Sequence, residues 1–161
     1  MEAWSDFFLG ELGAAGALAG LLVVAMSINI ERILATPSLP RRAAQTLIVI
    51  GGALVISSFA LFPGQPLWVF GWEVLAVGGA IGASGLVHLP RALAGLKRGE
   101  PLTWTLTPLT LVAVATLPML VGAVFLIAGD ASGLYWVATA VIFCMIAALL
   151  NGWVLLVEIL R

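Results

Sequence analysis

The chain has 161 residues, of which 62% are hydrophobic and 9% are charged, and its formal net charge at pH 7 is −1. Its mean hydropathy is +1.17. This composition excludes a soluble globular domain and indicates an integral membrane protein.

Continuous apolar runs of about 20 residues, the length that crosses a bilayer as a helix, can be placed five times. They cover residues 7–30, 43–62, 67–87, 107–128 and 134–157. Transmembrane β-strands would be shorter and would alternate between apolar and polar residues. We therefore expect residues 1–161 to form one all-α transmembrane domain of five helices. The acidic N-terminus lacks the basic start of a secretory signal, so the first helix is expected to remain in the mature protein.

All seven basic residues fall on one side of this arrangement. They are Arg32, Arg41, Arg42, Arg91, Lys97, Arg98 and Arg161. The loops on the opposite side hold only one charged residue, Asp130. By the positive-inside rule, the N-terminus is expected outside the cell and the C-terminus in the cytoplasm. The basic side is expected to contact lipid headgroups rather than nucleic acid.

The first helix has two different faces when read at 100° per residue. Gly13, Gly16 and Gly20 lie on one face, with Ser27 and Glu31 further along it. Because glycines let another helix come close, this face is expected to pack against the third helix or a second subunit. The opposite face carries Glu11, Leu18, Leu22 and Asn29. With no face suited to lipid alone, the helix is expected to be buried among other helices.

The second helix is apolar apart from Ser57 and Ser58, and is expected to face lipid. The short turn at residues 63–66 makes the second and third helices antiparallel neighbours.

The third helix has two different faces, as the first does. Its glycines are Gly78, Gly82 and Gly85, and its polar residues are Glu73, Ser84 and His88. An ionised Glu73 inside a membrane span needs a partner, water or a raised pKa.

The fourth helix contains Pro118, which removes one backbone hydrogen bond and is expected to bend the helix. The bend is either structural or a gating hinge. In the fifth helix, Asn151-Gly152 resembles a turn, but the apolar run continues beyond it. We therefore expect a helix there, with Asn151 as a buried amide that joins helices.

Residues suited to catalysis are few. The single His88 and the single Cys144 are expected at different depths, and no metal-binding or phosphate-binding spacing occurs. We expect no enzymatic activity, no cofactor and no metal site. A lone Cys144 also excludes a disulfide within the chain, and it is expected to act as a small packing residue.

Polar residues inside membrane spans are functional candidates because leaving them in hydrocarbon is costly. Here they are Glu11, Asn29, Glu31, Glu73, Ser84 and Asn151. A second interpretation stays open for two of them, since Glu31 is near enough to the cytoplasmic edge to be solvated or ion-paired and Glu11 lies near the outer water.

The segment Ile28-Asn-Ile-Glu-Arg-Ile-Leu, followed by Pro37-Ser-Leu-Pro-Arg-Arg-Ala, resembles a pattern in an uncharacterised family of small bacterial polytopic inner-membrane proteins. The resemblance covers about a fifth of the chain. It implies a bacterial plasma-membrane location and brings no activity or functional residues.

Two hypotheses of function follow. In the first, copies of the chain form a cation-favouring ion channel around a symmetry axis. Its pore-lining residues would be Glu11, Leu18, Leu22, Asn29 and Arg32. In the second, the protein is a non-transporting accessory subunit of a larger membrane complex, and its polar residues only join helices. A transporter ranks third, because no inverted repeat is evident.

Overall fold

The computed structural model describes residues 2–35, 39–87, 89–90 and 102–160, without the side chains of residues 2, 102–108 and 158–160. These residues are helical apart from short turns, and they contain no strand. After the 3-10 turn Glu2–Trp4, the helices are α1 (Ser5–Ile28), α2 (Ile30–Ala35), α3 (Leu39–Ala60), α4 (Leu67–Leu86), α6 (Leu102–Ile127) and α7 (Gly133–Leu160). All except α2 are long and apolar enough to cross a membrane. The expected five long helices are confirmed.

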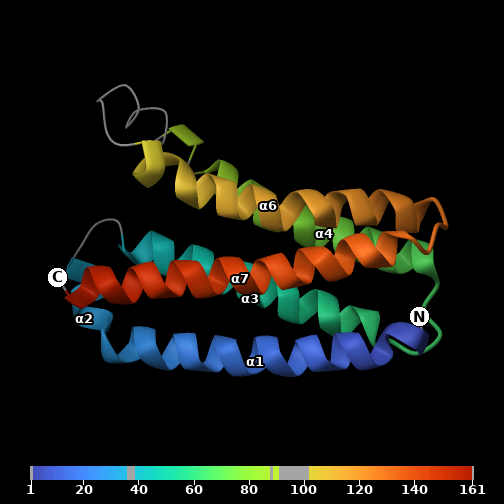
Figure 1. The fold of residues 1–161 in the computed structure, drawn as a ribbon, viewed down its shortest axis with the longest axis horizontal. Helices are drawn as coiled ribbons and strands as arrows, with labels where there is room; N and C mark the ends of the chain where they lie inside the picture. The colour runs from blue at the N-terminus through green and yellow to red at the C-terminus, as the bar shows by residue number, and fades with distance from the viewer. Residues whose placement is uncertain (1, 36–38, 88, 91–101, 161) are drawn as a thin grey trace.

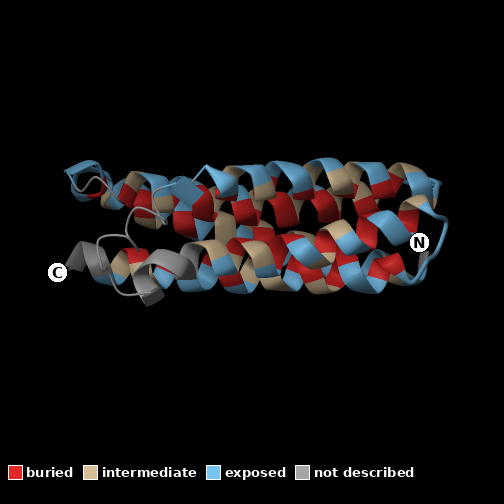
Figure 2. Cartoon of the chain, turned by 90° about the horizontal axis from the view of Figure 1, so that it is seen from above, coloured by how far each residue is buried: buried red, intermediate tan, exposed pale blue. Residues whose placement is uncertain are grey.

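The five long helices run side by side in one bundle (Figure 1). The helices α3 and α7 lie in the middle, with α1 on one side and α4 and α6 on the other. The most extensive pairing is α4 with α6, followed by α6 with α7, α3 with α7 and α3 with α1. The N-terminus and the C-terminus lie at opposite ends, as an odd number of antiparallel passes requires. Buried residues line the inside of the bundle (Figure 2).

Burial reverses two expectations about the first two helices. Over its most apolar window α3 is 56% buried, the highest share of the five, whereas α1 is 17% buried, the lowest. The prediction that the second helix faces lipid was therefore wrong, and the prediction that the first is buried among other helices is wrong for the helices of its own chain. Lipid tails are as apolar as leucine, so hydrophobicity alone does not tell which helix is central.

Glycines bring α4 close to α6 at a regular spacing of seven residues. A Cβ atom built on Gly71 would lie 2.8 Å from the backbone nitrogen of Ile127, and one on Gly85 would lie 2.7 Å from Cγ1 of Val112. Between them, a Cβ on Gly78 would lie 3.0 Å from the sulfur of Met119. The expected packing role is thus found for Gly78 and Gly85, whereas a Cβ on Gly82 would meet nothing within 4 Å.

Two turns at the N-terminal end of the bundle connect antiparallel helices. The first follows α3 and contains Gly64 with φ +67°, which agrees with the turn expected at residues 63–66 and with the adjacency of α3 and α4. The second contains Gly129 with φ +84°. Both glycines adopt the left-handed conformation that other residues rarely take.

The helix α6 continues through Pro118. The bend expected at this proline, as a structural feature or as a gating hinge, stays a prediction.

Candidate functional site

The inward face of α1 is the face that the sequence assigned to a water pathway. Phe8, Ala15, Leu22 and Met26 are its buried residues. Leu22 is 8% exposed, and its Cδ2 lies 2.7 Å from the position of a Cβ on Gly152 of α7. Leu18 also packs against the core. In this structure, therefore, the bulky side of α1 packs within its own chain and does not form an outer surface on which copies could meet.

The glycines of α1 point the other way. A Cβ atom on Gly13, Gly16 or Gly20 would meet nothing within 4 Å. The main partner of α1 is α3, with a smaller contact to α7. The expectation that these glycines pack against the glycines of the third helix was therefore wrong. Large side chains fill the groove beside α3 and α7 with more dispersion contacts than glycines would, so the small residues are left outside.

Glu11 lies at the edge of this packed face, near the N-terminal end of α1. Its side chain is partly buried, and its Oε2 atom is enclosed without a hydrogen-bond partner. A carboxyl oxygen without a partner in a largely apolar helix is costly. Among the described polar candidates of α1, Glu11 is thus the one with a buried oxygen that has no hydrogen-bond partner.

The helix is interrupted at Asn29, which the sequence analysis did not anticipate. The backbone N–H of Asn29 donates to the carbonyl of Met26 at 3.2 Å, and its side-chain Nδ2 donates to the carbonyl of Ala25 at 2.9 Å. The chain then resumes as the six-residue helix α2. An asparagine side chain can bond to nearby backbone groups and compete with the helix, as Asn29 does here, and this signal could have marked the break.

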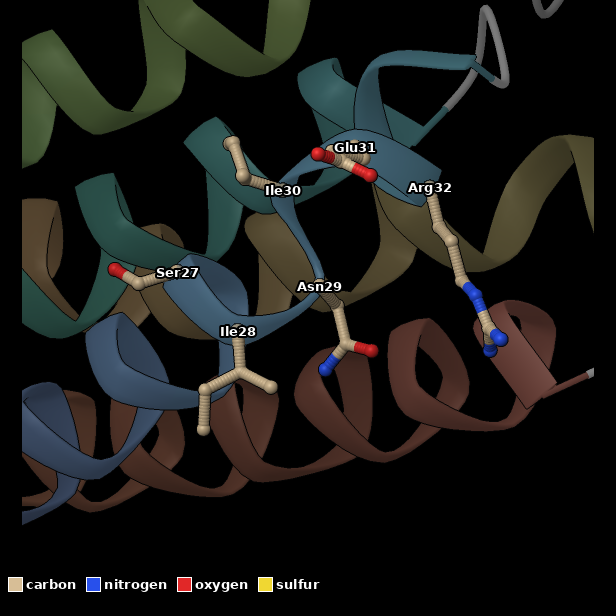
Figure 3. A pocket seen from close by; sticks show the side chains of 6 residues that line it. All are labelled: Ser27, Ile28, Asn29, Ile30, Glu31 and Arg32. Atoms are coloured by element: carbon tan, nitrogen blue, oxygen red, sulfur yellow. The ribbon is translucent and has the colours of Figure 1, made fainter.

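A cleft of about 430 Å³ opens at this break, lined by Ser27, Ile28, Asn29, Ile30, Glu31 and Arg32. In Figure 3 the side chains of Asn29 and Arg32 extend toward α7, whereas Glu31 lies on the opposite side of α2. Glu31 and Arg32 are both exposed. The exposure of Glu31 agrees with the interpretation that it is solvated or ion-paired at the edge of the bundle.

Glu73 has the partner that a carboxylate in an apolar helix requires. Nε2 of Gln65, in the turn before α4, donates a hydrogen bond to Oε2 of Glu73 at 2.6 Å. The other side-chain atom of this amide, Oε1 of Gln65, is buried without a hydrogen-bond partner. The turn before α4 therefore supplies the hydrogen-bond donor that orients the Glu73 carboxylate.

A second polar pair joins α3 to α4 near the opposite end of the bundle. Nε2 of Gln45 donates to Oγ of Ser84 at 3.2 Å, and Oγ of Ser84 donates to the carbonyl of Ile81 at 2.6 Å. Gln45 is 5% exposed. Ser84 was a candidate from the sequence and Gln45 was not, although the adjacent Gln45 and Thr46 are the polar residues of an otherwise apolar run.

The remaining candidates do not form a shared site. Asn151 lies in a continuous α7 and is 4% exposed, so the expected helix and buried amide are confirmed. Cys144 is fully buried. His88 lies outside the described residues. Among the described residues, no group of three or more His, Cys, Asp or Glu could hold a metal ion.

Comparisons with known proteins give no match: no family model, no curated protein and no solved structure is similar to this chain.

Proposed function

We propose that the protein is a multi-pass protein of the bacterial plasma membrane that acts by associating with the helices of a larger membrane complex, as a non-transporting accessory subunit. The observation that carries this proposal is the outward face of α1. This helix lies at the side of the bundle and presents small residues with open space above them, including Gly13, Ala17 and Gly20. Such a face lets another transmembrane helix approach closely.

The polar groups of the bundle support a structural role for its interior. Thr46 donates to the carbonyl of Arg42, and Thr116 donates to the carbonyl of Val112, both at 2.8 Å. Gln45 and Ser84 bind each other. These groups are satisfied by the chain itself, the two threonines within their own helices and Gln45 with Ser84 between α3 and α4. They therefore need no water-filled path.

The charges at the two ends support an orientation. Arg32, Arg41 and Arg42 lie at the end where α2 meets α3, whereas Asp6 and Asp130 lie at the end that holds the N-terminus. By the positive-inside rule, the first end faces the cytoplasm and the N-terminus lies outside.

The test is site-specific photo-crosslinking in intact membranes. A benzophenone amino acid at Ala17, on the outward face, is expected to give an adduct with another membrane protein, and the double substitution Gly13→Leu and Gly20→Leu is expected to abolish it. The matched control is the same probe at Val124, an exposed position on α6. An adduct at twice the mass of the chain, or equal adducts at both positions, contradicts an accessory subunit.

The second candidate is the homo-oligomeric cation channel, and one observation favours it. The enclosed, unpartnered oxygen of Glu11 is what a cation-binding carboxylate in a membrane would present. In liposomes, Glu11→Gln would lower cation flux and Leu18→Ser would raise it. Because Leu22 is packed inside the chain, this pathway requires α1 to move away from α7. Equal flux from all variants and from empty liposomes rejects the channel.

A further inference from the structure

We propose that the cleft at the α1–α2 break binds a phosphate group at the level of the lipid headgroups, with an anionic phospholipid as its source. The proposal rests on the membrane location in the proposed function but not on any protein partner. It starts from the cleft that Asn29 and Arg32 line together (Figure 3).

The length of α1 sets the depth of this cleft. The helix has 24 residues, which corresponds to about 36 Å at 1.5 Å per residue. The hydrocarbon core of a bilayer is about 30 Å thick. A helix that begins at the outer surface therefore brings Asn29 to the opposite headgroup layer, where phosphate groups lie.

The donors in the cleft suit a phosphate. Asn29 uses its side-chain nitrogen for the carbonyl of Ala25, and an amide nitrogen carries a second N–H. The chain already holds Arg32 by an interaction of its own, and a guanidinium carries five N–H donors in a planar fork that matches phosphate oxygens. Both side chains extend to the same side of the break, whereas the carboxylate of Glu31 lies on the other side. Glu31 lines the cleft as well, so a phosphate would meet the donors of Asn29 and Arg32 on the α7 side of the cleft.

Exposed apolar side chains at the break favour a lipid as the source. Ile28, which lines the cleft, is 78% exposed, and Leu34, two residues beyond Arg32 in the chain, is 67% exposed. A phospholipid carries acyl chains that would cover such side chains, while a free phosphate would leave them uncovered.

The experiment is native mass spectrometry of the purified full chain in detergent, titrated with phosphatidylglycerol and, separately, with phosphatidylcholine. Tight binding is expected for phosphatidylglycerol. Because hydrogen bonds to charged groups are strong, Arg32→Gln is expected to weaken it by about tenfold. Arg41→Gln removes an exposed arginine of the same end and is the matched control, expected to leave binding unchanged. Elution volume and helical content, measured for each variant, confirm folding.

The outcomes distinguish a phospholipid from free phosphate as the ligand, and they distinguish this proposal from the proposed accessory subunit. Because phosphatidylcholine also carries a phosphate group, equal affinity for both lipids overturns the anionic phospholipid as the source. Equal loss of binding in both variants overturns the cleft as the site. Displacement of phosphatidylglycerol by millimolar inorganic phosphate overturns the lipid as its source. Photo-crosslinking at Ala17 reports the proposed function separately, because that position lies outside the cleft.

Discussion

Gly133 of α7 faces Gly122 of α6 so closely that a Cβ atom on Gly133 would lie 2.6 Å from the carbonyl oxygen of Gly122. The reverse contact, from a Cβ on Gly122 to the carbonyl oxygen of Gly133, would be 2.9 Å. Both partners are backbone atoms, which cannot move without moving a helix. The close approach of the two helices therefore depends on glycine at Gly133, where α7 begins, and at Gly122, in the last turns of α6.

Alanine at Gly133 is expected to destabilise the protein by about 1–3 kcal/mol, because overpacking against backbone forces the helices apart. At Gly152 the cost is expected to be smaller, since the neighbouring atom is the flexible end of Leu22. At Gly13, where a Cβ meets nothing, alanine is expected to be neutral or stabilising. Unfolding in mixed detergent micelles measures all three, and an equal loss at Gly13 and Gly133 would contradict this ranking.

The Gln45–Ser84 pair is expected to couple α3 to α4. A double-mutant cycle with Gln45→Leu and Ser84→Ala should give a coupling free energy of about 0.6 kcal/mol, the average for hydrogen bonds between membrane helices. The same Gln45→Leu substitution combined with Ser58→Ala is the control, because Ser58 bonds to the carbonyl of Leu54 in its own helix. Coupling of equal size in both cycles would show that the pair is not specific.

The thiol of Cys144 is expected to resist labelling. It is fully buried in α7, so a water-soluble maleimide should react only after denaturation. Fast labelling of the native protein would mean that the bundle opens around α7.

The proposed orientation is expected to appear as one-sided labelling. A maleimide that does not cross membranes should label Ala131→Cys, an exposed position in the turn between α6 and α7, in intact cells. It should label Ala35→Cys, an exposed position at the end of α2, only after the membrane is opened. The reverse pattern would invert the topology.

The turn after α6 is expected to weaken at acidic pH. The backbone N–H of Ser132 donates to Oδ1 of Asp130 at 2.8 Å, and this bond, with a further one from the Ser132 side chain, holds the pKa of Asp130 below its ordinary value of 3.8. Since the folded-state pKa is the lower one, the contribution is complete above pH 3.8 and is lost as the pH falls through the folded-state pKa. The difference in stability between the native chain and Asp130→Asn should shrink over that range. A constant difference down to pH 2 would contradict the assignment.

The sequence by itself determined the number of long helices and their approximate ends, because a bilayer requires about 20 apolar residues per span. It also indicated that Glu73 needs a partner, since an isolated carboxylate in hydrocarbon is costly. The turn at residues 63–66 followed from its prolines and glycine. These features depend on local composition, which can be read without knowing which helices touch.

Only the tertiary structure decided which face of α1 turns inward and which helix is central. Both faces of α1 are compatible with hydrocarbon, so the hydrophobic pattern carried no information about direction. The shapes of the side chains decided which face turns inward. Phe8, Leu22 and Met26 pack beside α3 and α7, and the glycines remain outside. The same holds for Gln45, whose partner Ser84 lies 39 positions away in the chain.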